Sequence, residues 1–106
     1  MTEIDKMFKN AGIKPLCQIT DKFCGVQNIY AVFTADKQLE LIKWLSKRRL
    51  LNITFCENKN TYQLSNNKCT GSFCSDLAIA VITLVQCELD FCTEEEKEEI
   101  RRILNE

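Results

Sequence analysis

The stretch from Leu77 to Val85 limits the fold of this chain more than any other feature, because it contains only apolar residues apart from Thr83. It falls far short of the ~20 residues that a membrane-spanning helix needs. A helix that is apolar on nearly every face is normally buried on all sides. We therefore expect a central helix over about 73–89, capped at its start by Ser72 or Ser75. The same apolar surface is a candidate for a contact between subunits.

Three further segments carry helical signals. Residues 3–11 place apolar side chains at helical spacing. Thr34 can cap a helix over about 35–49, in which the cations of the last turn suit the helix dipole. In the helix predicted over about 94–105, Thr93 and Glu96 have the spacing of a capping box.

Two segments predict β-hairpins, at about 16–33 and 51–65. The first is rich in β-branched and aromatic residues on both sides of a turn at 21–25. In the second, apolar residues alternate with polar ones before a turn at 57–60. A two-stranded hairpin alone is only marginally stable, so we expect helices to cover its apolar face. The predicted fold class is α+β, a single domain over residues 1–106 with a short antiparallel sheet packed against helices.

Composition argues against several classes of protein. The 106 residues are 45% hydrophobic and 27% charged, which is ordinary for a globular domain. A net charge of −1 predicts no general attraction to nucleic acid or anionic lipid. The first residues lack the basic and apolar regions of a secretory signal, so we expect a cytoplasmic protein with no membrane association. In that reducing compartment the cysteines are expected to be free thiols: Cys17, Cys24, Cys56, Cys69, Cys74, Cys87 and Cys92.

The chain has no histidine, which removes most constellations used for catalysis near neutral pH. We find no cofactor motif and predict a protein that is not an enzyme. The cysteines lack the Cys-x2-Cys knuckle of structural zinc sites. A site built from the pairs Cys69/Cys74 and Cys87/Cys92 would have to bridge about 20 Å, the length of the intervening helix. Cys74, expected in the first turn of that helix, is the candidate reactive thiol because a helix N-terminus lowers a thiol pKa.

One basic cluster contains an aromatic residue, a combination that nucleic-acid-binding surfaces use to contact phosphates and to stack on bases. The simpler interpretation is a solvated helix end whose cations interact with the exposed carbonyls. Neither a helix-turn-helix signature nor a glycine-rich phosphate loop accompanies the cluster. Its members are Lys43, Trp44, Lys47, Arg48 and Arg49.

The predicted order helix, strand, strand, helix over Asp36–Leu89 has Trp44 near the end of its first helix, and the run Gly71–Val81 leads into its second. This pattern resembles the small phage and prophage proteins grouped as phage ABA sandwich domains. In that family a short sheet is held between helices, and a helix of the Leu-Ala-x-Ala type follows the hairpin. The resemblance covers roughly half of the chain and implies no established activity and no catalytic residues. The cysteines and the segment before Ala35 are not part of the pattern.

Three functional hypotheses remain open, and the first two, of different classes, are the main ones. The first is a non-enzymatic protein, related to phages or mobile elements, that acts by protein–protein interaction with itself or with a host factor. Its motivation is the apolar central helix together with the missing active site. The alternative is a nucleic-acid-associated accessory protein that uses the Lys43–Arg49 cluster. The third hypothesis is a redox or metal sensor built on the cysteines.

Overall fold

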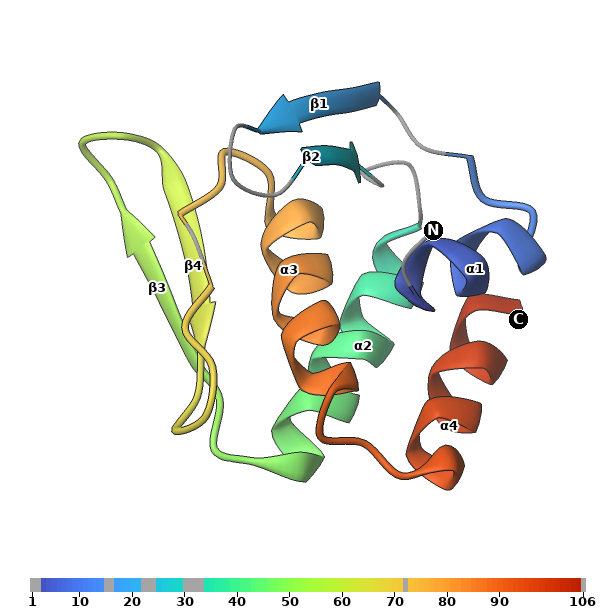
Figure 1. Cartoon of the computed structure of the whole chain (residues 1–106). Coiled ribbons are helices and arrows are strands. Elements are labelled where there is room, and N and C mark those ends of the chain that lie inside the picture. Colours follow the sequence, from blue (N-terminus) through green and yellow to red (C-terminus); the bar gives the residue numbers. More distant parts are fainter. Residues whose placement is uncertain (1–2, 15–16, 22–24, 30–33, 72, 106) are drawn as a thin grey trace.

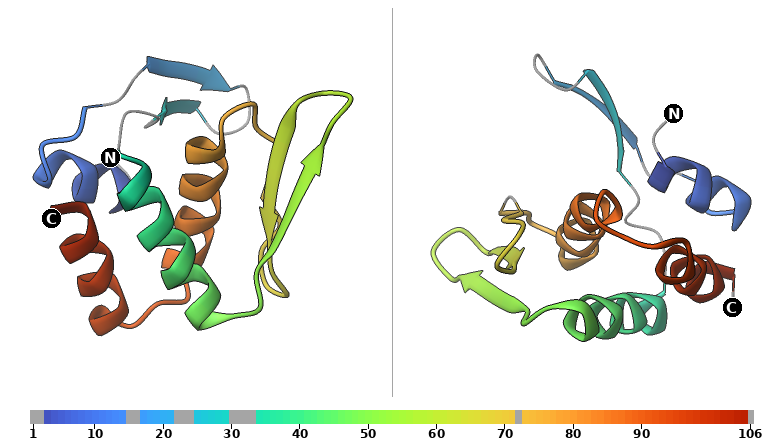
Figure 2. Two further views of the ribbon diagram at one scale, coloured as in Figure 1. Left: turned by 180° about the vertical axis from the view of Figure 1, so that it is seen from behind. Right: turned by 60° about the horizontal axis from the view of Figure 1, so that its bottom comes forward.

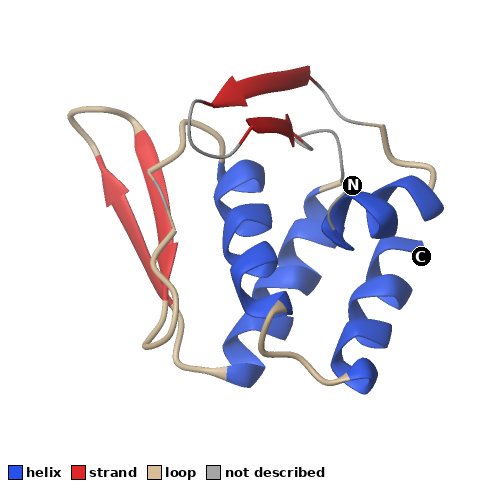
Figure 3. Cartoon of the chain, in the orientation of Figure 1, coloured by secondary structure: helices blue, strands red, loops and turns tan. Residues whose placement is uncertain are grey.

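The computed structural model of the chain describes residues 3–14, 17–21, 25–29, 34–71 and 73–105. Within these ranges it contains four α-helices and two β-hairpins (Figures 1 and 3), so the predicted α+β class is confirmed. In chain order the elements are α1 (Glu3–Asn10), β1 (Cys17–Asp21), β2 (Gly25–Ile29), α2 (Ala35–Arg48), β3 (Asn52–Cys56), β4 (Thr61–Ser65), α3 (Leu77–Leu89) and α4 (Glu94–Asn105).

Helix α3 occupies the centre of the fold, as its apolar sequence predicts. The β3–β4 hairpin packs on one side of it through β4, and α2 packs on another (Figure 1). Helix α1 contacts α3 and α4, and α4 also packs against α2. Both views of Figure 2 place the β1–β2 hairpin outside the layer of helices. None of the helices in the described ranges has the length and the apolar character to cross a membrane.

The core is built from the apolar faces of the four helices and from one residue of β4. Within α3, Gln86 alone is exposed, because neighbouring elements cover the apolar residues of that helix. The apolar residues of α3 that remain partly exposed are Leu77, Ile79 and Cys87, so a subunit contact on this helix stays a prediction with little apolar surface to use. The buried apolar residues are Ile4, Met7, Phe8, Leu41, Trp44, Leu45, Leu64, Ala78, Ala80, Val81, Ile82, Leu84, Val85, Leu89, Ile100, Ile103 and Leu104.

Two of the predicted helix caps are confirmed in detail. The Thr34 hydroxyl accepts a hydrogen bond from the Lys37 amide at 3.3 Å at the start of α2. At the start of α4, the Thr93 amide donates to the Glu96 carboxylate at 3.0 Å, and the Glu96 amide donates to the Thr93 hydroxyl at 3.3 Å. These reciprocal bonds satisfy amides that a helix start otherwise leaves without partners.

The start of the central helix was predicted wrongly. Helix α3 begins at Leu77 and not near residue 73, and its cap is Asp76, whose carboxylate accepts from the Ala78 amide at 2.8 Å. Of the two caps that we expected, Ser75 precedes the true one, and Ser72 lies outside the described residues. The physical reason is that the connector before α3 bonds to β4 instead of to the helix.

The two hairpins form separate two-stranded antiparallel sheets, β1–β2 and β3–β4. The β3–β4 hairpin has the predicted turn at 57–60, with Cys56 opposite Thr61 and Asn52 opposite Ser65. In the first hairpin β1 pairs with β2 in the register Cys17 to Ile29. The predicted second strand extended to residue 33, and residues 30–33 lie outside the described ranges.

The apolar face of the β3–β4 hairpin is only half covered, which departs from our expectation. Leu64 of β4 is fully buried beneath α3. Opposite Leu64 and Tyr62, the β3 residues Ile53 and Phe55 are 51% and 50% exposed. Strand β4 contacts α3, whereas β3 extends past the helices at the margin of the fold (Figure 1).

Candidate functional site

The basic cluster predicted on α2 divides into exposed and buried members. The ammonium groups of Lys43 and Lys47 are exposed and pair with acidic side chains, Glu40 at 3.3 Å and Glu99 at 3.5 Å. Ion pairs at such exposed positions contribute little to stability. Each lysine charge is thus accompanied by a carboxylate, which reduces the positive potential of this helix face.

Trp44 is buried, so the structure does not offer its ring for stacking on a base. Its side chain is 3% exposed, and the indole Nε1 donates to the carbonyl oxygen of Glu96 at 3.1 Å. The guanidinium of Arg48 lies 5.3 Å from the centre of the ring, within the range of a cation–π contact. This placement corrects our expectation of a nucleic-acid contact at Trp44, because the ring joins α2 to α4 inside the molecule.

Arg48 and Arg49 are held by a buried carboxylate from a different helix. The Nε of Arg48 donates to Oε2 of Glu88 at 2.8 Å, and the Nε of Arg49 donates to Oε1 of Glu88 at 2.9 Å. The side-chain amide of Asn66 donates to the same Oε1 at 3.0 Å. Arg48 also pairs with Glu96 of α4. These contacts form the Glu88 network, which we define as Glu88, Arg48, Arg49, Asn66 and Glu96.

The charges of the Glu88 network compensate one another inside the fold. Burial alone raises the pKa of the Glu88 carboxyl, but hydrogen bonds from Arg48, Arg49 and Asn66 outweigh burial and leave that pKa below its usual value. Glu88 is fully buried, and its partners are the last residue of α2, the C-cap residue that follows it, and Asn66 in the turn after β4. The arrangement serves to fasten the C-terminal ends of α2 and α3 together.

Sequence reasoning missed Glu88. The signal was the single charged residue of the helix, a carboxylate in its last turn with no basic residue on the same helix. A buried carboxylate needs a partner from elsewhere in the chain. The two arginines at the end of α2 are the available cations, whereas the sequence alone relates them to the dipole of their own helix and to a candidate nucleic-acid contact.

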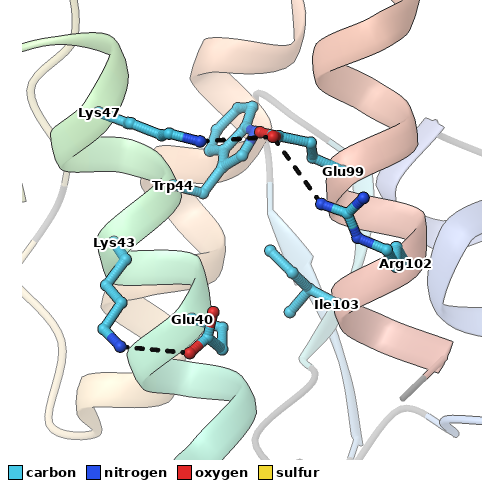
Figure 4. Close-up of a pocket in the computed structure, with 7 residues that line it drawn as sticks. All are labelled: Glu40, Lys43, Trp44, Lys47, Glu99, Arg102 and Ile103. Atoms are coloured by element: carbon cyan, nitrogen blue, oxygen red, sulfur yellow. Dashed lines mark hydrogen bonds and ion pairs between the residues drawn. The ribbon is translucent and has the colours of Figure 1, made fainter.

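A hollow of about 340 Å³ lies between α2 and α4 (Figure 4). Trp44 and Ile103 give it an apolar floor, and paired charges surround that floor. The hollow contains neither a thiol nor a hydroxyl group. Its two lysine amines, the side chains of Lys43 and Lys47, are each paired with a carboxylate. The residues that line it are Glu40, Lys43, Trp44, Lys47, Glu99, Arg102 and Ile103.

Cys74 does not lie in the first turn of α3, which corrects our placement of a reactive thiol. It precedes the helix and pairs with β4, where its amide donates to the Tyr62 carbonyl at 2.8 Å and its carbonyl accepts from the Tyr62 amide at 2.7 Å. Burial raises the pKa of its thiol, and Asp76 adds to that effect, while a hydrogen bond with Thr83 opposes it. A raised thiol pKa disfavours the nucleophilic thiolate.

The described cysteines carry no disulfide, and two of them are neighbours. Cys69 interacts with Cys87 of α3, because the connector before α3 runs back along that helix. The separation of about 20 Å that we expected for the cysteine pairs therefore does not hold for these two. Burial, reinforced by Cys87 and Glu88, raises the pKa of the Cys69 thiol to about 11. In the described part of the chain, no three potential ligand side chains are grouped as a metal ion would require.

The edge of β3 that does not pair with β4 is a further candidate for the functional site. Both its backbone groups and its side chains bear on this. In an antiparallel pair, opposed residues alternate between those that bond to each other and those that point their backbone groups outward. Tyr62 bonds to Cys74 on the far side of β4, and the Leu64 carbonyl accepts from the Gly71 amide at 3.0 Å on the same side. The residues opposite them therefore direct their backbone groups away from β4.

These outward residues are Ile53 and Phe55. Among the described residues, none bonds to the backbone N–H and C=O groups that they direct outward. The same two residues carry the half-exposed apolar side chains of the strand, and the Phe55 ring lies 5.0 Å from the Tyr62 ring. We name this surface, formed by Asn52–Cys56, the β3 edge. Within the described residues it combines backbone groups that have no partner with exposed apolar area, which is the combination that an added strand would use.

A scan against protein-family models and searches of curated proteins and of solved structures found no match to this chain.

Proposed function

We propose that this protein works without catalysis, by binding another protein chain, either a second copy of itself or a host factor, and that the β3 edge is its docking surface. The observation that carries the proposal is the coincidence at Ile53 and Phe55 of half-exposed apolar side chains with backbone groups directed at an open edge. Edge strands of stable monomers are usually protected by charged residues, proline or a bulge. Strand β3, with the sequence Asn-Ile-Thr-Phe-Cys, has no charged residue and no proline.

The chemistry of the chain supports a binding role over a catalytic one. The sequence has no histidine, and the thiols of Cys69, Cys74 and Cys92 have pKa values above the ordinary one. The hollow between α2 and α4 presents charges that are already paired. A cytoplasmic location is part of the proposal, because free thiols persist in a reducing compartment.

An origin in a phage or mobile element is also part of the proposal. Its support is the order helix, strand, strand, helix of α2, β3, β4 and α3, which is the order on which the resemblance to phage ABA sandwich proteins rests.

Nucleic-acid binding is the less supported alternative. Of its proposed contacts, Trp44 is buried, and Arg48 and Arg49 are bonded to Glu88. Only Lys43 and Lys47 remain exposed, fewer than the several phosphate contacts that such binding uses. A salt-sensitive shift on DNA or RNA that is lost in Lys43→Glu/Lys47→Glu would favour this alternative.

Photo-crosslinking tests the docking role with a matched control. A benzophenone-bearing phenylalanine analogue replaces Phe55 in one variant and Leu39 of α2 in another. These two side chains are 50% exposed each, so the variants differ in location and not in accessibility. We expect a discrete protein adduct from position 55 and none of comparable yield from position 39. Equal yields at the two positions, or no adduct at position 55, would overturn the proposal.

A further inference from the structure

We infer that the partner of the β3 edge is a second copy of this chain, paired antiparallel about a two-fold axis that passes beside Thr54. This inference rests on the proposed function, because it names the occupant of the same surface. The two hairpins would then form one continuous four-stranded sheet in the order β4, β3, β3, β4. A two-fold axis perpendicular to the sheet keeps the same face of each copy on the same side.

The hydrogen-bonding pattern of β3 selects this register. Residues whose backbone groups point toward a partner strand must face residues of the same kind. In the register centred on Thr54, Ile53 faces Phe55 of the second copy and Phe55 faces Ile53. Each such pair exchanges an N–H and a C=O in both directions. All positions from Asn52 to Cys56 are then paired, whereas a shift by two residues in either direction leaves part of the strand unpaired.

The side chains agree with the same register. Ile53 and Phe55 lie on the face of the hairpin that includes the buried Leu64, and both remain half exposed in the single chain. Pairing about Thr54 places aromatic against aliphatic side chains across the new strand pair, which is a favourable cross-strand combination. It also extends the apolar cluster of Phe55 and Tyr62 across the boundary between the copies.

Charge favours a second copy as the occupant. The strand Asn52–Cys56 contains no charged residue, so two copies meet along it without opposing like charges. The whole chain has a net charge of −1, and a net charge near zero promotes association between copies. A strand of this length gives an interface at the small end of the range for specific complexes. The dimer is therefore expected to be reversible and to depend on concentration.

A charge swap at Thr54 tests the pairing and its register together. Thr54 is exposed, and its two copies would sit directly opposite each other at the two-fold axis. The variants are Thr54→Lys, Thr54→Glu and their equimolar mixture, with Gln86→Lys at an exposed position of α3 as the control. Analytical ultracentrifugation at protein concentrations up to roughly 1 mM measures the association, including dissociation constants of that order.

We expect wild type and Gln86→Lys to dimerise and each Thr54 variant alone to associate roughly tenfold more weakly, because like charges are juxtaposed. The mixture is expected to recover at least the wild-type affinity. A wild type that stays monomeric at the highest concentration, or a Thr54→Lys variant that dimerises like wild type, would overturn the inference.

Amide hydrogen exchange of the wild type gives a second measurement that needs no variant. The Thr54 amide points toward β4 and is expected to be protected at every concentration. The amides of Ile53 and Phe55 point outward and should gain protection only as the concentration rises. Exchange at these two amides that does not change with concentration would count against self-pairing.

The two proposals fail in distinguishable ways. The crosslinked adduct from position 55 has twice the mass of the chain if the occupant is a second copy. An adduct of another mass, together with a monomeric wild type, overturns self-pairing and leaves the docking role of the β3 edge standing. Absence of any adduct that is specific to position 55 overturns the docking role itself.

Discussion

At the scale of single residues, Glu88 is the charged residue that the described part of the chain buries completely. Its carboxylate is fully buried and bonded to Arg48, Arg49 and Asn66. A buried ion pair adds little net stability compared with a well-packed apolar group, but removal of one member leaves the others as uncompensated buried charges. The contribution of Glu88 to the free energy of unfolding is therefore measured by the loss of stability when its side chain is removed.

Replacement of Glu88 by alanine is expected to lower the free energy of unfolding by about 3–5 kcal/mol. Arg48 would lose one of its two carboxylate partners, and Arg49 would lose the carboxylate to which it is bonded. Urea unfolding followed by circular dichroism measures the change. Glu40→Ala removes an exposed carboxylate that pairs with Lys43, and this control should cost about 1 kcal/mol or less. Equal losses in the two variants would contradict a structural role of the Glu88 network.

The lowered pKa of Glu88 also predicts a pH dependence. A carboxyl whose folded pKa is depressed contributes stability that is complete above its unfolded pKa, about 4.3 for glutamate, and is lost as the pH falls through the folded pKa. The difference in unfolding free energy between wild type and Glu88→Gln should therefore be constant near neutral pH and shrink in acid. A difference that grows as the pH falls would mean that the folded pKa is raised.

The thiols give a third prediction at this scale. Burial raises the pKa of Cys69 to about 11, which lowers its thiolate fraction at neutral pH roughly hundredfold relative to an ordinary cysteine. We expect iodoacetamide to label Cys69 and Cys74 slowly in the native protein and rapidly in urea, as mapped by peptide mass spectrometry. Native labelling of Cys74 at the rate of a free cysteine would contradict this expectation, and faster labelling would restore the activated thiol that the sequence suggested.

At the scale of elements, local signals in the sequence identified the helices and the β3–β4 turn. Thr34, Thr93 and Glu96 make the predicted caps because capping depends on residues within one turn of each other. The start of α3 was not predictable in the same way. Gly71 and Cys74 bond to β4, and such bonds between distant segments leave no periodic trace in the sequence.

Gly71 shows how closely the connector approaches β4. A Cβ atom at this position would stand 2.9 Å from the Leu64 carbonyl oxygen, closer than van der Waals contact permits. Gly71→Ala should therefore push the connector away from β4 and cost about 1–3 kcal/mol of stability. Ser75→Ala, at an exposed residue of the same connector, should change stability by less than about 0.5 kcal/mol. Urea midpoints compare the two variants, and a neutral Gly71→Ala would show that the connector can shift freely.

At the scale of the whole molecule, the apolar stretch of α3 predicted the centre of the fold, because a helix that is apolar on most faces has to be surrounded. The sequence could not show which residues of the β3–β4 hairpin pack against the helices and which stay exposed. The cover of the helices reaches Leu64 of β4 and leaves Ile53 and Phe55 of β3 half exposed. The candidate docking surface follows from this limited reach, and the basic cluster on α2, which stood out in the sequence, is largely paired within the chain.

The Glu88 network also has a consequence for the order of events during folding. Glu88 bonds to residues 40, 39 and 22 positions away along the chain, in α2 and in the turn after β4. The loop-closure entropy of these long separations has to be overcome before the bonds can form, so we expect them to form after the folding transition state. Glu88→Gln should then accelerate unfolding and leave the folding rate nearly unchanged, a φ-value near zero in stopped-flow chevron measurements. The network would thus form last during folding and would set the rate at which the folded state unfolds.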